Sequence, residues 1–275
     1  MQPDMFDFPV EIKKLNWPFS SNFNENEIQK LLDEFIGASI PPEQEKVFEF
    51  YEFARTDIGL SHSATVLYVP NKGYFSVKSI AYSPSIVLSL KKPPVDLANY
   101  YRMRTQHLIH SLGEHFPETG ILESKSEEFL IIFQKFLFYP ICQFSTAQQI
   151  SQLIEILWLA ARARILLDYN QNHWLSSQLD FLYYVDIDYI GQSYFDYQKC
   201  ILDNLNQSLA FITQENVTLL PQALTIFSES GDPQTEFIKD FKKVLKKLIG
   251  SWGDEKQLSE AHKLKLDVFK NILRT

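Results

Sequence analysis

Glycine is scarce in this chain of 275 residues, which contains only 9 glycines. Neither the G-x-G-x-x-G pattern of dinucleotide-binding folds nor the G-x-x-x-x-G-K-[ST] pattern of P-loop proteins occurs in the sequence. Any loop that binds phosphate must therefore depart from both patterns. Collagen-like and glycine-rich repeat architectures are excluded as well.

Cysteine, basic charge and long apolar runs are also in short supply. Cys142 and Cys200 are too few and too far apart for a disulfide framework or a metal knuckle. The net charge is -8, so nucleic acid is not an expected partner. The longest apolar stretch, residues 153–167, is interrupted by charged residues, and we expect no membrane insertion. Residues 1–10 lack the pattern of a secretory signal, and a reducing, cytoplasmic location fits this composition.

The sequence is instead rich in apolar and aromatic residues, with 45% hydrophobic residues and 22 phenylalanines. A chain of this composition buries a sizeable core. The first forty residues form a polar extension that contains one amphipathic helical segment, at 25–35. Beyond it, short segments rich in Val, Phe, Tyr and Ile predict three strands before and two strands after a helix at 95–112. These strand segments are 46–53, 64–69, 74–80, 121–123 and 129–136.

The second half of the chain is mainly helical in its periodicity. Apolar residues at helical spacing predict a long helix at 146–167 and three further helices at 194–213, 234–249 and 256–273. A polar loop at 168–178 precedes a short buried strand at 181–187 that ends on carboxylates. The sequence thus predicts an α+β chain with an extension at 1–40, a strand-rich lobe at 41–138 and a helical lobe at 139–275.

Three short motifs follow one another in this order of elements. Residues 59–66 read Gly-Leu-Ser-His-Ser-Ala-Thr-Val, residues 75–78 read Phe-Ser-Val-Lys, and Asp186 ends an apolar strand as part of Asp-Ile-Asp. In their order and spacing, these motifs resemble those of the protein-kinase-like superfamily, including its small-molecule phosphotransferase branch, over residues 48–188. The resemblance implies a two-lobe fold with a small antiparallel β-rich N-terminal lobe and a larger, mainly helical C-terminal lobe.

The resemblance also implies that the strand-rich lobe binds ATP. In the family, a loop of pattern G-x-G-x-x-G-x-V covers the nucleotide phosphates and a strand lysine supplies a positive charge to them. The corresponding residues of this chain are Gly59, Ser61, Ala64, Val66 and Lys78. Serine and alanine stand where two of the family's glycines would be, so the loop is stiffer than usual.

The helical lobe carries the implied catalytic and metal-binding residues. The resemblance makes Asp186 a ligand of Mg²⁺, with Asp188 as a substitute or additional ligand. Asp168, 18 residues before Asp186, is the expected base that accepts a proton from the attacking hydroxyl. The family's metal-binding Asn is expected five positions after the base, where this chain has His173, and a one-residue adjustment makes Asn172 the second ligand.

Two departures from the family pattern keep two functions open. The family's H-R-D triplet is absent, because Leu166 and Leu167 precede Asp168, and the helix at 95–112 has no central Glu to pair with Lys78. The first hypothesis is an ATP- and Mg²⁺-dependent phosphotransferase with an unidentified acceptor. The second is a catalytically inactive pseudokinase that serves as a binding or regulatory module for a protein partner. A helical interaction protein without kinase ancestry is a third, weaker reading.

One further cluster of potential metal ligands stands apart from these motifs. His107, His110 and Glu114 share a helix face by their spacing and would offer three ligands. Histidines near a helix end more often face solvent or the terminal carbonyls. We therefore expect this cluster to have no metal.

Overall fold

The computed structural model of the chain describes residues 10–16, 18, 26, 30, 33, 49–55, 62–69, 73–81, 97–123, 129–137, 139–140, 144–170, 173–176, 181–187, 196–253 and 258–274. The chain divides into two compact units. Unit 1 comprises Met1–Gln106 and Pro117–Phe138, and unit 2 comprises His107–Phe116 and Tyr139–Thr275. The predicted limits of the two lobes, at 41–138 and 139–275, stay predictions.

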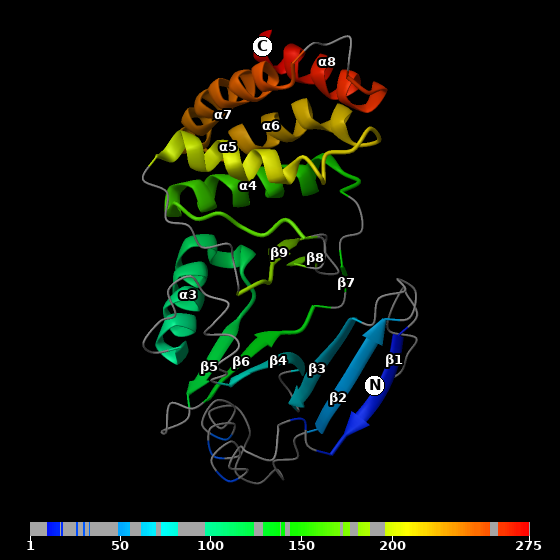
Figure 1. Ribbon diagram of the computed structural model, residues 1–275, viewed down its shortest axis with the longest axis vertical. Coiled ribbons are helices and arrows are strands. Elements are labelled where there is room, and N and C mark those ends of the chain that lie inside the picture. The colour runs from blue at the N-terminus through cyan, green and yellow to red at the C-terminus, as the bar shows by residue number, and fades with distance from the viewer. Residues whose placement is uncertain are drawn as a thin grey trace. The chain divides into compact units, whose positions relative to one another are not determined.

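Unit 1 contains a six-stranded antiparallel sheet whose strand order is β1-β2-β3-β4-β6-β5 (Figure 1). The strands are β1 (Val10–Leu15), β2 (Glu49–Arg55), β3 (His62–Val69), β4 (Gly73–Ala81), β5 (Thr119–Glu123) and β6 (Phe129–Lys135). Five of them confirm the predicted strand segments. Gly73 begins β4 opposite Val69, and its φ of 92° is readily adopted only by glycine.

The interior of this sheet is formed by β-branched and aromatic side chains of its central strands. Val66, Leu67, Phe75, Ile131 and Phe133 are each at most 2% exposed. Side chains of this shape pack well on a pleated surface, which is why these segments form strands. Lys78 lies on β4 opposite Ile132, with an exposed side chain.

Strand β1 lies within residues 1–40, which the sequence predicts to be a polar extension with one helical segment. It pairs with β2 along its whole length, and Lys14 Nζ donates to Glu49 Oε1 at 2.6 Å across the pair. The adjacent Lys13 and Lys14 break the apolar alternation of Val10, Ile12 and Leu15, so the sequence pattern was weak. Most of the predicted helix at 25–35 lies outside the described residues.

Unit 2 is built mainly of helices. The helices that lie wholly in it are α4 (Ala147–Ala163), α5 (Tyr197–Ser208), α6 (Leu220–Ser228), α7 (Asp232–Ser251) and α8 (Glu260–Arg274). They stack in layers, with α4 packed on α5 and α6, and α7 packed on α5, α6 and α8 (Figure 1). Helix α3 (Leu97–Leu112) contributes residues to both units and ends at residue 112, as predicted.

Helix α4 begins with a complete capping box and ends earlier than expected. Thr146 Oγ1 accepts from the backbone N–H of Gln149, and the Gln149 side chain accepts from the backbone N–H of Thr146. At the other end Arg164 adopts a left-handed conformation, with φ 61°, so the helix stops at Ala163 rather than at residue 167. The apolar residues 165–167 continue the sequence pattern but belong to a buried extended segment.

Two further elements of unit 2 were not predicted. Helix α6 has nine residues and Pro221 near its start, where proline is favoured. The predicted polar loop at 168–178 contains β8 (Trp174–Ser176), the middle strand of a small sheet with β7 (Tyr139–Pro140) and β9 (Leu182–Tyr184). Strand β9 is the central part of the strand predicted at 181–187.

The described residues therefore form a mixed chain with one six-stranded antiparallel sheet, one small sheet and six α-helices. This content confirms a chain of both strands and helices and is compatible with a two-lobe kinase-like fold. Among these residues, no helix has the length and apolar character needed to cross a membrane.

Candidate functional site

Two carboxylates and one imidazole of unit 2 converge at the end of the β8–β9 hairpin. The ligand atoms of Asp168, His173 and Asp186 all lie within 4.8 Å of one another. His173 Nδ1 is 3.2 Å from Asp168 Oδ2 and 3.6 Å from Asp186 Oδ2. A cluster of this kind is suited to a cation, because carboxylate oxygens and imidazole nitrogens are common metal ligands.

The hairpin places two of the three side chains. Trp174 pairs with Tyr184, and Ser176 pairs with Leu182 in antiparallel register. One further backbone bond extends the ladder beyond the strands, from Val185 N–H to His173 C=O at 2.9 Å. This bond holds residue 173 opposite residue 185, which directly precedes Asp186.

Asp168 comes from the loop that follows α4, and Asn204 on α5 fixes this loop. Asn204 is fully buried, and its Oδ1 accepts from Leu167 N–H at 3.2 Å and from Tyr169 OH at 3.1 Å. Its Nδ2 donates to the carbonyl oxygen of Ile165 at 2.9 Å. One amide side chain thus satisfies backbone groups on both sides of residue 166, which a buried loop requires.

Tyr184 connects the backbone of Asp168 with the carboxylate of Asp186. Its hydroxyl accepts from Asp168 N–H at 3.1 Å and lies 3.5 Å from Asp186 Oδ2, to which it donates. The Tyr184 ring is fully buried and meets the Trp174 ring edge to face, while Trp174 Nε1 donates to the Asp168 carbonyl oxygen at 3.1 Å. The loop and the hairpin are therefore joined by polar contacts directly beneath the cluster.

Exposure differs among the three side chains. The Asp186 side chain is 8% exposed, that of His173 27% and that of Asp168 36%. A buried carboxylate is costly unless a cation or hydrogen-bond donors neutralise it. Asp186 is thus the most buried of the three side chains and accepts from Tyr184 OH, and Asp168 is the most open.

The structure brings together Asp168 and Asp186, two of the residues predicted for catalysis and metal binding. Asn172 and Asp188 lie outside the described residues. In unit 1, Val66 is buried in β3 and Lys78 is exposed on β4, and only the backbone of Ala64 in β3 is described. Gly59 and Ser61 lie outside the described residues, as does Cys142. The roles of all these residues stay predictions.

His173 is the site residue that the sequence argument passed over. It stands five positions after Asp168, which is where the family pattern has its metal-binding Asn, but Asn172 was preferred because an amide matches the family's residue type. His173 Nδ1 lies 3.6 Å from Asp186 Oδ2, whereas Asn172 lies outside the described residues and its role stays a prediction. In the described part of the chain, His107, His110 and Glu114 do not form a comparable cluster.

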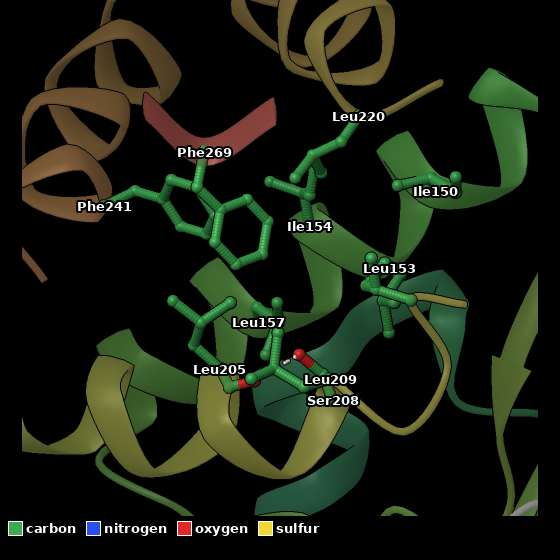
Figure 2. Close-up of a pocket in the computed structure, with 11 residues that line it drawn as sticks. Ile150, Leu153, Ile154, Leu157, Leu205, Ser208, Leu209, Leu220, Phe241 and Phe269 are labelled. Atoms are coloured by element: carbon green, nitrogen blue, oxygen red, sulfur yellow. Dashed lines mark hydrogen bonds between the residues drawn. The ribbon is translucent and has the colours of Figure 1, made fainter. Parts of the chain in front are cut away.

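A small apolar cavity lies elsewhere in unit 2, among helices α4, α5, α6, α7 and α8. Figure 2 shows Ile154, Leu157, Phe241 and Phe269 around it, with Ser208 at its edge. It leaves about 10 Å³ for the centre of a water molecule. Space of that size holds one water at most, and the Ser208 hydroxyl already donates to the Leu205 carbonyl oxygen. The cavity belongs to the helix packing and is too small for a nucleotide.

Comparisons with known proteins add little to this geometry. No protein-family model matches the chain, and no curated protein matches it. Among solved structures, the Legionella pneumophila Lpg2603 kinase bound to IP6 matches with 12% sequence identity and a TM-score of 0.34, over 86% of this chain and 94% of that chain. A functional assignment therefore depends on the site itself.

Proposed function

We propose that the protein is an ATP-dependent phosphotransferase of kinase-like fold that acts on an unidentified acceptor. The observation that carries this proposal is the convergence of Asp168, His173 and Asp186 at the end of one hairpin. Phosphoryl transfer depends mainly on positioning and on neutralising charge, and it needs a cation held beside a base. The cluster offers residues for both tasks.

The residues present fit a divalent cation. Asp186 supplies a buried carboxylate, and His173 supplies a nitrogen that faces the same point. Asp188 and Asn172 remain proposed additional ligands. When bound, the cation would neutralise negative charge on the ATP phosphates. Asp186 and His173 would orient it, and their positions are set by the pairing of β8 with β9.

Asp168 is the proposed base. Its Oδ1 accepts from Asn170 N–H at 3.0 Å, which fixes the carboxylate and leaves Oδ2 directed toward the cluster. In the proposed reaction the acceptor hydroxyl oxygen forms a bond to the γ-phosphorus, the bond to the ADP oxygen breaks, and the hydroxyl proton passes to Asp168. The partial exposure of this carboxylate allows an acceptor to reach it.

The proposed nucleotide contacts come from unit 1. Lys78 would supply a positive charge to the phosphates, and Gly59, Ser61, Ala64 and Val66 would cover them. The support for these roles is the order of the motifs along the chain together with the exposure of Lys78 on β4.

One observation favours the non-catalytic alternative, a pseudokinase that binds a partner. His173 Nδ1 faces an oxygen of each carboxylate, at 3.2 Å and 3.6 Å. In its protonated form the imidazole would itself be the cation between Asp168 and Asp186, and no metal would be needed. The two candidates differ in whether ATP and a divalent cation bind together.

Thermal unfolding with ATP and a divalent cation tests the proposal. A ligand at a hundred times its Kd adds about 2.7 kcal/mol to the free energy of unfolding, so the wild type should unfold at a higher temperature only when both are present. Asp186→Asn keeps an acceptor for Tyr184 OH and should lose this shift. Asp267→Asn, which changes an exposed aspartate on α8, should retain it. A wild-type protein that shows no shift with ATP and either Mg²⁺ or Mn²⁺ contradicts the proposal.

A further inference from the structure

The most unusual feature of the cation site is its nitrogen ligand. Within the described part of the chain, His173 Nδ1 is buried without a hydrogen bond, although a carboxylate oxygen lies 3.2 Å away. We propose that His173 binds the cation directly and gives the site a preference for first-row transition metal ions over Mg²⁺. This inference rests on the proposed function, because it takes the cluster of Asp168, His173 and Asp186 to be the cation site of the phosphotransferase.

The spacing of the three side chains fits shared coordination. Ligand atoms about 2.0–2.1 Å from one tetrahedral metal ion are about 3.4 Å apart. The separations of His173 Nδ1 from the oxygens of Asp168 and Asp186 are 3.2 Å and 3.6 Å, close to this value. A hydrogen bond to either oxygen would require a different orientation of the ring. The imidazole nitrogen therefore lies close to both oxygens without being aligned for a hydrogen bond to either.

Ligand chemistry gives the expected direction of selectivity. Mg²⁺ prefers oxygen ligands and keeps several waters. Imidazole nitrogen suits transition metal ions, and for a given set of ligands affinity rises from Mn²⁺ to Co²⁺. Replacing an amide oxygen by an imidazole nitrogen at one position should therefore favour Mn²⁺ and Co²⁺ over Mg²⁺.

A variant can remove the imidazole without removing the hairpin. The backbone of residue 173 donates to the Asn170 carbonyl oxygen and accepts from Val185 N–H, both at 2.9 Å, and neither bond involves the side chain. His173→Asn leaves these bonds in place and returns the position to an amide. His110→Asn is the matched control, because it makes the same exchange of imidazole for amide outside the cluster. His110 is an exposed histidine of α3, one helical turn from His107.

Calorimetric titration of the full chain with Co²⁺ and with Mg²⁺, without nucleotide, measures the preference. His173→Asn should lower Co²⁺ affinity at least about tenfold, as expected for a lost metal ligand, and change Mg²⁺ affinity less than threefold. His110→Asn should change neither. Equal effects on the two ions, or no effect of His173→Asn on Co²⁺, overturn the inference.

If His173→Asn does not fold, a measurement on protein that retains the His173 imidazole tests the inference instead. Pulsed electron paramagnetic resonance of Mn²⁺ bound to the His110→Asn variant should show coupling to an imidazole nitrogen, and its absence overturns the inference. The outcomes separate the two proposals. Nitrogen coupling without any ATP-dependent stabilisation rejects the phosphotransferase alone, whereas ATP-dependent stabilisation without nitrogen coupling rejects the role of His173 alone.

Discussion

Asn204→Leu is the sharpest structural test of how the loop with Asp168 is held. The substitution leaves Leu167 N–H and Tyr169 OH without the buried amide oxygen that accepts from both. A buried donor that loses its partner costs about 1–3 kcal/mol. Two such groups give a loss of roughly 2–6 kcal/mol, a large fraction of the 5–15 kcal/mol by which native domains are typically stable.

Urea unfolding followed by tryptophan fluorescence measures this loss. Trp174 is a suitable reporter because its Nε1 donates to the Asp168 carbonyl oxygen. Asn206→Leu on the same helix is the control, since residue 206 is exposed, and it should stay within about 0.5 kcal/mol of the wild type. If Asn204→Leu and Asn206→Leu are equally stable, the reasoning about the loop is refuted.

Three further predictions concern unit 2. Thr146→Ala removes the N-cap of α4 and should lower the free energy of unfolding by about 1 kcal/mol in the same urea assay. Gln148→Ala is the control, because Gln148 takes no part in the capping box. Phe269→Ala enlarges the cavity of Figure 2 and should cost about 3–5 kcal/mol; a loss below about 1 kcal/mol would mean that the cavity collapses. Burial raises the pKa of Cys200 to about 11. Its thiol therefore stays protonated at pH 8, and peptide-resolved iodoacetamide labelling should modify it only after unfolding; rapid labelling of the native protein would contradict this.

The sequence predicted those elements whose periodicity is long or whose composition is distinctive. Strands β3 and β4 were evident from their apolar and aromatic composition, and α4 from the helical spacing of its apolar residues. The end of α4 was not predictable, because residues 165–167 are apolar in either conformation. The helix ends at the left-handed Arg164, and the residues after it make tertiary hydrogen bonds with Asn204 on α5, which the local sequence does not reveal.

Short elements were missed for a related reason. Strand β8 has three residues, and its burial pattern depends on neighbours that periodicity does not reveal. The same limit applies to the candidate site. Asp168 and Asp186 were identified from spacing and strand position, but His173 was set aside on residue type. The register of the β8–β9 pair places residue 173 opposite residue 185, and its imidazole nitrogen lies 3.6 Å from Asp186 Oδ2.

Transfer of the γ-phosphate of ATP in the presence of a divalent cation tests the central claim most directly. With radiolabelled ATP and Mn²⁺ or Mg²⁺, the wild type is expected to transfer label to itself, to water or to a supplied acceptor, and chelation of the cation should stop this. Asp168→Asn should still be stabilised by ATP with the cation and should lose transfer by about 10²-fold or more, as expected for the loss of a general base. A wild type that binds ATP and the cation without transferring phosphate, or an Asp168→Asn variant as active as the wild type, would contradict the account.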